Sequence, residues 1–224
     1  MEKYTDEIIL RNSSNLNFSK QQENIPALFL DRDGVLVREV HYLNSVEDVA
    51  LEIGSIQLLR TAYLAKWPVV IVTNQSGISR GILSWDDYKS ITQTIIKLIG
   101  EPSPVSAIYS NSLGPDAQEN SWRKPSPLML QIAASKLSID LSRSILIGDR
   151  LSDLQAGVRA GLSCVMHVLT GHGEEERQEI LSHLDTRGRF ISGVHKSDFL
   201  KLNTLHDFPF EKLLKRNYST ESYP

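Results

Sequence analysis

The sequence predicts an α/β protein whose mainly parallel sheet is covered by helices on both faces. Short apolar runs, of which residues 27–31 and 69–72 are the clearest, alternate along the chain with segments of helical periodicity. Polar or turn-forming residues bound each run, as expected of strands that are buried on both faces. Strands that alternate with helices form right-handed βαβ units, and these units build a parallel sheet.

Length and composition suit one globular domain with a full core. The chain has 224 residues, of which 41% are hydrophobic and 23% are charged. A formal net charge of -3 gives no reason to expect a nucleic-acid partner. Cys164 is the only cysteine, which excludes an intrachain disulfide and a thiolate zinc cage. Apolar stretches of the roughly 18 residues that a membrane span needs are absent. Residues 1–7 lack a secretion signal, so we expect a cytoplasmic protein.

The first half of the chain is predicted to contain three strands and two helices. The strands are the apolar runs at 27–31, 69–72 and 105–109. The helices each have one apolar face, and they cover about 53–66 and the segment from Ser84 onward. Pro68 helps to end the first helix, and Asp87 forms a capping-box pair with Ser84 at the start of the second.

The second half repeats this alternation. Strands are predicted at 144–149 and 164–169, with an edge strand at 199–202. Helices are predicted at about 127–137, from Ser152 to Gly161, from Glu174 onward and near 209–216. Ser126 is expected to cap the first of these helices with Pro127 at its first position, and Ser152 is expected to cap the second.

A single domain is expected over residues 26–216, because no repeat or linker divides this range. Residues 1–25 are polar and rich in Asn, Ser and Gln, so we expect an N-terminal extension that is poorly ordered or packs late. Residues 217–224 are expected to be a C-terminal tail. The gaps between the motifs described next leave no room for a large cap domain.

Functional side chains follow three of the predicted strands. Asp31 and Asp33 come directly after the first apolar run, and Thr73 and Asn74 follow the second. Asp149 ends the fourth strand. Because parallel strands present their carboxyl ends at one edge of the sheet, we expect these side chains to meet in a crevice there.

Further charged residues are expected to reach the same crevice. Arg123 and Lys124 lie just before a helix, and Asp153 follows Asp149 by four residues. Carboxylate oxygens are the ligands that Mg²⁺ prefers, and a bound cation relieves the repulsion between a carboxylate nucleophile and a phosphate. A hydroxyl and a lysine can hold phosphate oxygens. The set therefore suits phosphoryl transfer.

Each motif taken alone has an ordinary structural alternative. Asp31-Arg32-Asp33-Gly34 could be an acidic turn, and residues 73–77 could be a polar turn. Asp153 could merely stabilise a helix N-terminus. The occurrence of all of them at the ends of predicted neighbouring strands favours the functional interpretation.

Together these residues resemble the four motifs of haloacid-dehalogenase-like (HAD-like) phosphatases, in order and at workable spacing. Within that superfamily they are similar to the D-glycero-D-manno-heptose 1,7-bisphosphate phosphatases and the related histidinol-phosphate phosphatases. The resemblance covers about residues 27–170 and implies a three-layer α/β/α, Rossmann-like fold. The matching stretches are Asp31-Arg32-Asp33-Gly34-Val35, Thr73-Asn74-Gln75-Ser76-Gly77, Arg123-Lys124-Pro125 and Gly148-Asp149-Arg150-Leu151-Ser152-Asp153.

The resemblance implies a role for each matching residue. Asp31 matches the nucleophile and a magnesium ligand. Asp33 matches the general acid and base, with its backbone carbonyl on the metal. Thr73 matches the phosphate-binding hydroxyl, and Lys124 matches the cation that stabilises the transferring phosphoryl group. Asp149 matches the magnesium ligand of the last motif.

Other residues are implied to surround this set. Asp153 is expected to orient the site from behind the metal ligands. A second group, on the segment 39–42 and beside the motifs, is implied to bind substrate: Glu39, Val40, His41, Tyr42, Thr73, Asn74, Gln75, Ser76, Arg123, Lys124 and Arg150.

One stretch departs from the family pattern. Bacterial members of the heptose group usually carry a zinc loop of Cys-x-His and Cys-x-Cys before Arg-Lys-Pro, whereas residues 110–112 and 120–122 here read Ser-Asn-Ser and Asn-Ser-Trp. We therefore expect Mg²⁺ and no zinc. The loop is expected to be ordered by packing, with Trp122 a candidate, or to be mobile. No chemistry is assigned to residues 172–197.

The expected function is that of a magnesium-dependent phosphatase acting through an aspartyl-phosphate on a sugar bisphosphate of the heptose type. Histidinol phosphate or another small phosphate monoester is the alternative substrate. A non-catalytic phosphate-binding scaffold is the alternative of another class. We expect a monomer or a weak homo-oligomer.

Overall fold

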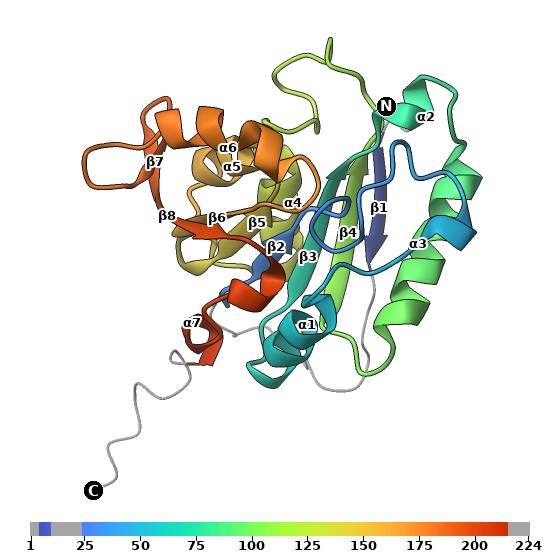
Figure 1. Ribbon diagram of the computed structural model, residues 1–224, viewed down its shortest axis with the longest axis horizontal. Helices are drawn as coiled ribbons and strands as arrows, with labels where there is room; N and C mark the ends of the chain where they lie inside the picture. The colour runs from blue at the N-terminus through green and yellow to red at the C-terminus, as the bar shows by residue number, and fades with distance from the viewer. Residues whose placement is uncertain (1–4, 10–23, 215–224) are drawn as a thin grey trace, which may run out of the picture.

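The protein is built on one eight-stranded sheet. The computed structural model describes residues 5–9 and 24–214. In the sheet the strands follow the order β1-β4-β3-β2-β5-β6-β8-β7 (Figure 1). Their bounds are β1 Thr5–Ile9, β2 Leu28–Leu30, β3 Val69–Asn74, β4 Val105–Asn111, β5 Ile145–Gly148, β6 Cys164–Val168, β7 Phe190–Ser192 and β8 His195–Leu202.

All the inner pairs of the sheet are parallel, and only the two edge pairs, β1–β4 and β7–β8, are antiparallel. The α-helices are α1 Ser55–Leu64, α2 Ser76–Ser79, α3 Trp85–Ile99, α4 Leu128–Leu137, α5 Leu151–Arg159, α6 Gly173–Ser182 and α7 Glu211–Leu214. Three short 3-10 helices complete the described elements: Val46–Asp48, Leu141–Arg143 and Leu205–Asp207. The predicted α/β architecture is therefore confirmed.

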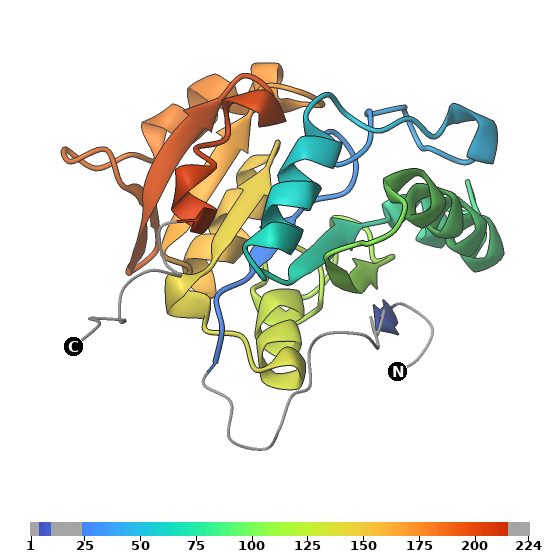
Figure 2. The same ribbon diagram turned by 90° about the horizontal axis from the view of Figure 1, so that it is seen from below.

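Helices cover both faces of the sheet and form a three-layer α/β/α arrangement. One apolar cluster joins residues of α1, α3 and α7 to one face, and a second joins α4, α5 and α6 to the other. Figure 2 shows α1 (cyan) and α4 (yellow-green) on opposite sides of the sheet. Strand β2 illustrates why its whole sequence is apolar. Leu28 and Leu30 belong to the first cluster, and Phe29 belongs to the second.

The helix starts show which capping predictions hold. Ser84 and Asp87 form the expected capping box at the start of α3. Helix α4 begins one residue later than expected, so Pro127 occupies its N-cap position. The prediction that Ser152 caps α5 is wrong. That helix begins at Leu151, and the carboxylate of Asp153 accepts a hydrogen bond from the cap backbone N–H at 3.0 Å.

Part of the N-terminal extension belongs to the sheet. Residues 5–9 form β1, which pairs antiparallel with β4 along its whole length. The side chain of Glu7 accepts a hydrogen bond from the Tyr109 hydroxyl at 2.9 Å and also pairs with Lys136. The expectation that residues 1–25 lie outside the domain is therefore wrong for residues 5–9. Their short apolar segment has polar residues on both sides, so the sequence pattern did not predict a strand. Residues 1–4 and 10–23 lie outside the described part of the chain.

The C-terminal third also differs in detail. The expected edge strand at 199–202 is longer, His195–Leu202, and β7 lies outside it as the true edge. The segment 172–197, which received no chemistry, contains α6 and β7. Helix α7 covers Glu211–Leu214, and the rest of the predicted helix and the tail at 217–224 lie outside the described residues.

Short loops, rather than a second domain, surround the carboxyl edge of the sheet. Within residues 24–214, every segment between strands is either a helix of one of the two layers or a short connection, so this range contains no large cap domain. Among the described helices, none is both long and apolar enough to cross a membrane.

Candidate active site

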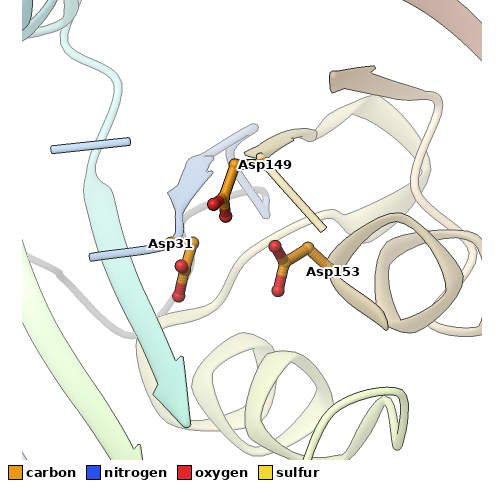
Figure 3. A group of neighbouring side chains, drawn as sticks. All are labelled: Asp31, Asp149 and Asp153. Atoms are coloured by element: carbon orange, nitrogen blue, oxygen red, sulfur yellow. The ribbon is translucent and has the colours of Figure 1, made fainter. Parts of the chain in front are cut away.

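The predicted functional residues meet at the carboxyl ends of β2, β3 and β5. These three strands are adjacent and parallel, with Leu30 opposite Ile71 on one side and Ile147 on the other. Asp31 and Asp149 directly follow the last residues of β2 and β5, with Asp149 one residue further along than Asp31, and their side chains lie in one space at this edge. In Figure 3, the carboxylates of Asp31, Asp149 and Asp153 turn toward one another.

These three carboxylates form one buried cluster with Lys124. One oxygen from each lies within 4.8 Å of the others. The Lys124 ammonium donates to Asp31 Oδ1 at 2.6 Å and pairs with Asp153 Oδ1 at 2.7 Å. Its third contact is the Val72 carbonyl at 2.8 Å. All three of its donors are therefore used, and the ammonium stands in a fixed position beside Asp31.

The cluster carries an excess of negative charge. Three carboxylates and one ammonium have a net charge of -2 when all are ionised. Burial, with the neighbouring carboxylates Asp153 and Asp33, raises the pKa of Asp31 to about 7 although Lys124 opposes this shift. Burial, Asp153 and Asp31 raise the pKa of Asp149 well above its usual value. Burial opposes protonation of Lys124, but Asp153 and Asp31 outweigh it and raise the pKa of that ammonium.

The site fits a divalent cation. Asp149 Oδ1 is buried and has no hydrogen-bond partner among the described residues. A Cβ on Gly34 or Gly171 would come within 2.5 Å and 2.3 Å of the other oxygen, Oδ2, so both glycines leave room for this carboxylate. Both oxygens of Asp153 are occupied by Lys124 and the Arg150 N–H. Asp31 and Asp149 are thus the carboxylates best placed to hold Mg²⁺, as expected.

Asp33 lies at the wall of the cleft, held by two neighbours. The Arg32 guanidinium donates to both of its oxygens, at 3.0 and 3.1 Å from Nε. Gln75 Nε2 donates to Asp33 Oδ2 at 2.7 Å and to the Thr73 hydroxyl at 2.8 Å. Gln75 Oε1 accepts from Arg32 at 3.0 Å. Arg32 and Gln75, which are also bonded to each other, therefore fix the orientation of Asp33 at the cleft.

Asn74 lines the cleft, but both ends of its amide bond to the protein backbone. Its amide Nδ2 donates to the Lys124 carbonyl at 3.2 Å, and its Oδ1 accepts from the Lys124 N–H at 3.1 Å. This reciprocal pair ties the end of β3 to the segment that carries the lysine. The sequence predicts that Asn74 binds substrate, whereas these contacts indicate that it positions Lys124.

A cleft of about 740 Å³ opens above the cluster. Most of the predicted substrate-binding residues line it: Glu39, His41, Tyr42, Asn74, Gln75, Ser76, Arg123, Lys124 and Arg150. Val40 does not line it and is 37% exposed, because its side chain points away from a segment whose neighbours point inward. The buried Thr73 hydroxyl lies beneath the lining and reaches it through Gln75.

Three arginines stand at the rim of this cleft: Arg80, Arg123 and Arg150. Half-burial and then the positive charges of Arg150 and Arg80 lower the pKa of Arg123, which shows that the three guanidinium groups act on one another. Arg80 also donates to the Tyr42 hydroxyl and lies over that ring. Three carboxylates, Glu39, Glu176 and Glu179, also line the cleft, so the rim carries both signs of charge above a negatively charged floor.

The loop between β4 and Lys124 is held by packing. Trp122 lies against Tyr109, with 5.8 Å between the ring centroids. Arg123 donates to the Leu113 carbonyl at 2.8 Å and its N–H donates to the Ser121 hydroxyl at 3.3 Å. The expectation that Trp122 helps to order this loop is thus supported by a direct contact.

Three residues near the site received no role from the sequence. Arg80 lines the cleft and lies three residues after the stretch 73–77, so its closeness to that stretch is the signal that could have identified it. Arg32 lies between the two aspartates of the first motif. Its role becomes visible only in the folded chain, where its guanidinium donates a hydrogen bond to Gln75 Oε1. His172 donates its backbone N–H to Asp149 Oδ2 at 2.8 Å. No local sequence pattern predicts this contact of a backbone N–H group.

Comparison with known proteins agrees with this geometry. A family model described as HAD-hydrolase-like matches residues 121–191. The chain is 38% identical over 147 residues to D-glycero-beta-D-manno-heptose-1,7-bisphosphate 7-phosphatase of Mesorhizobium japonicum, which covers 62% of this chain and 68% of that protein. It is 36% identical over 167 residues to the alpha-anomer enzyme of Photorhabdus laumondii, covering 71% of this chain and 91% of that protein. The chain belongs to the heptose-1,7-bisphosphate 7-phosphatase family.

Solved structures of this family share the fold. A HAD-like phosphatase from Mesorhizobium loti superimposes with a TM-score of 0.73 at 28% identity, over 96% of this chain and 93% of that one. The D,D-heptose 1,7-bisphosphate phosphatase from B. bronchiseptica, complexed with magnesium and phosphate, superimposes with a TM-score of 0.71 at 27% identity, over 86% and 99% of the two chains. The resemblance seen in the sequence is thereby confirmed.

Proposed function

We propose that this chain is a magnesium-dependent phosphatase that removes the 7-phosphate of D-glycero-D-manno-heptose 1,7-bisphosphate. The observation that carries this proposal is the buried contact between Asp31 and Lys124 at 2.6 Å, next to Asp149 with its unpartnered oxygen. A nucleophile, a phosphate-binding cation and a metal ligand are thus assembled at one point. The names of the heptose bisphosphate relatives support the substrate.

Asp31 is the proposed nucleophile. A carboxylate oxygen of Asp31 attacks phosphorus, the new P–O bond forms as the bond to the sugar oxygen breaks, and Asp33 donates a proton to that leaving oxygen. Water then attacks the phosphorus of the aspartyl-phosphate while Asp33 accepts its proton. Inorganic phosphate leaves and the Asp31 carboxylate is restored.

The remaining residues hold charge in place during both steps. Lys124 stands beside Asp31 and offers positive charge to the equatorial phosphoryl oxygens. Asp153 fixes that ammonium from its other side. Mg²⁺, held by Asp31 and Asp149 when bound, would supply further charge neutralisation for the phosphate. The buried setting of these groups excludes bulk water from all but the cleft side.

The arginines of the rim support a bisphosphate rather than a simple monoester. The reacting phosphate occupies the floor, and the opposite end of the sugar then lies near Arg80, Arg123 and Arg150. Guanidinium groups bind phosphate through paired N–H donors. A second phosphate at the far end of the substrate would give these guanidinium groups an anionic partner that a monoester lacks.

The test is a phosphate-release assay with purified protein and Mg²⁺. The substrates are both anomers of heptose 1,7-bisphosphate, histidinol phosphate and a panel of sugar monophosphates, and ³¹P NMR identifies the phosphate that is lost. We expect the highest kcat/KM on one bisphosphate anomer, with the 1-phosphate retained. Higher kcat/KM on histidinol phosphate would replace the proposed substrate. Release from none of the substrates would favour a scaffold on the same fold.

A further inference from the structure

Helix α6, the turn before it and the end of β6 form hydrogen bonds with the last motif, residues 148–153. Three of the residues involved, His172, Glu176 and Arg177, belong to the segment 172–197, to which the sequence assigned no chemistry. Asp149 is fully buried. Its carboxylate, its carbonyl and the N–H group two residues further on each bond to a residue between positions 167 and 177. One proposed metal ligand and the backbone next to it are therefore held by several contacts from a single stretch of the chain.

The carboxylate is held from the turn. The His172 N–H donates to Asp149 Oδ2 at 2.8 Å. Gly171 packs so closely that a Cβ there would lie 2.3 Å from the same oxygen and 2.6 Å from the Gly34 Cα. The Thr170 hydroxyl donates to the Gly34 carbonyl at 2.5 Å. The oxygen Oδ2 is thereby fixed, and Oδ1 remains buried and without a hydrogen-bond partner among the described residues.

The carbonyl of Asp149 is held through His167, which is fully buried on β6. Its Nε2 lies 2.9 Å from the Asp149 carbonyl oxygen, and its Nδ1 lies 2.7 Å from Arg177 Nε. An arginine N–H can only donate, so Nδ1 must accept. A neutral imidazole that accepts at Nδ1 carries its hydrogen at Nε2, and this hydrogen donates to the carbonyl.

The other side of the motif is held by the residue next to Arg177. Glu176 Oε2 accepts a hydrogen bond from the Leu151 N–H at 2.6 Å, at the start of α5. Arg177 is itself fixed by the carbonyls of His167 and Leu202, at 3.2 and 2.9 Å. The backbone that follows Asp149 is therefore held at two points, by His167 at the Asp149 carbonyl and by Glu176 of α6 at the Leu151 N–H.

We propose that Arg177 and His167 are positioning residues for the Asp149 metal ligand. Arg177 holds His167 in the tautomer that donates to the Asp149 carbonyl, and this bond keeps Oδ1 directed at the metal. The inference rests on the proposed function, because it concerns affinity for Mg²⁺. Outer contacts of this kind change metal affinity by about 10-fold or more when they are lost.

The test compares Mg²⁺ binding, measured by isothermal titration calorimetry without substrate, across four single variants and one double variant, His167→Gln with Arg177→Met. His167→Leu removes the donor, and Arg177→Met removes the group that fixes the tautomer. His167→Gln keeps an amide N–H donor that needs no tautomer. The matched control is Arg189→Met, which removes a half-exposed arginine whose ion pair with Asp185 has no path to Asp149. Melting temperatures without metal are recorded for each.

We expect His167→Leu to weaken Mg²⁺ binding by about 10-fold, and Arg177→Met by a smaller factor. His167→Gln should bind more tightly than His167→Leu. Adding Arg177→Met to the His167→Gln background should have little further effect on Mg²⁺ affinity, because the amide donor does not depend on the arginine. Arg189→Met should bind as the wild type does, whatever its melting temperature.

Several results would overturn the proposal. One is wild-type affinity in both His167→Leu and Arg177→Met. Another is an equal loss from Arg177→Met in the wild-type and His167→Gln backgrounds, which would mean that the arginine acts by another route. A third is a loss in Arg189→Met as large as that in His167→Leu. If His167→Leu does not fold, the comparison of Arg177→Met in the two backgrounds still decides.

A second measurement does not depend on the metal. Long-range ¹H–¹⁵N spectra of ¹⁵N-histidine-labelled protein, with the His167 signals assigned from His167→Gln, report which ring nitrogen carries the hydrogen. We expect Nε2–H in the wild type, and Nδ1–H would overturn the proposal. Failure of the proposed function would look different: wild-type protein would not bind Mg²⁺ at all, while the expected tautomer would still be observed.

Discussion

The floor and the rim of the cleft are built in opposite ways. The floor consists of Asp31, Asp149, Asp153 and Lys124, and the rim carries Arg80, Arg123 and Arg150. On the floor, Asp149 and Lys124 are 0% and 3% exposed, and the ion pairs of the lysine measure 2.6 and 2.7 Å. On the rim, Arg80 and Arg150 are exposed, and the Arg150–Glu176 pair is 3.5 Å long. The floor is buried and has an excess of negative charge, whereas the rim is exposed and carries arginines beside glutamates.

This difference separates chemistry from recognition. Charges on the floor interact in a medium of low polarity, so the removal of one leaves its partners buried and unpaired. Charges on the rim are screened by water and salt, and each contributes little alone. The floor should therefore tolerate no substitution without a loss of rate, and the rim should respond gradually, mainly in KM. The following predictions test this division, from the largest expected effect to the smallest.

Replacing the nucleophile should abolish activity while leaving the fold intact. Asp31→Asn keeps the shape of the side chain, but the amide cannot attack phosphorus, so kcat should fall on the order of 10⁴-fold or more. Phosphate release and circular dichroism are the measurements. Residual activity near the wild-type rate would move the nucleophile elsewhere, and loss of the far-ultraviolet signal would show that the change acts through folding.

Lys124→Met should cost both rate and stability. The ammonium neutralises Asp31 and Asp153, so its removal leaves two buried carboxylates facing each other. We expect kcat to fall about 10²- to 10³-fold and the melting temperature of the metal-free protein to fall. Mg²⁺ should restore part of the stability but not the rate. A variant with unchanged kcat would contradict the assignment of the lysine to the transferring phosphoryl group.

Metal binding should depend on pH because of the raised pKa of Asp31. Burial raises this pKa from 3.8 to about 7 in the metal-free protein. Between these values the folded chain keeps a proton that the unfolded chain has lost. Consequently the Asp31 contribution to the free energy of unfolding falls as pH rises through this window. Mg²⁺ must displace that proton, so its apparent affinity should fall up to about 10-fold per pH unit below 7.

Thermal unfolding with EDTA and with Mg²⁺ at pH 5, 6, 7 and 8 measures this effect. The stabilisation by Mg²⁺ should grow up to about pH 7 and then level off, in line with the pKa of Asp31. Asp31→Asn, which cannot titrate at this position, provides the control and should lose much of the pH dependence. A stabilisation that does not change with pH would contradict a protonated floor in the metal-free protein.

A rim substitution should have the smallest effect. Arg80→Met removes one of three positive charges above the floor, so KM for the bisphosphate should rise about 5-fold with kcat unchanged. The increase should shrink in high salt. Arg60→Met removes an exposed arginine that lines a separate hollow on α1, and its KM should match the wild type. A large loss of kcat in Arg80→Met would place this residue in the chemistry and break the division between floor and rim.

Sequence patterns predicted the floor better than the rim. Asp31, Thr73 and Asp149 each follow an apolar run, and the parallel order of strands then forces them together. The rim depends on where loops fold back. Val40 lies between two lining residues and still points away, whereas Arg80 lines the cleft from the far end of a polar loop. Loop side chains have no fixed period, so their directions cannot be read from spacing.

By itself, the sequence determined the layered α/β fold and the identity of the residues on the floor, because strand burial and strand order are encoded in local apolar runs. Only the tertiary structure decided how those residues are held. The Asn74 amide forms two hydrogen bonds with the backbone of Lys124, and the His167 ring is hydrogen-bonded to the carbonyl of Asp149. Such contacts join backbone groups to side chains far away in the chain. A backbone N–H or carbonyl looks alike at almost every position, so only the folded chain shows which one is engaged.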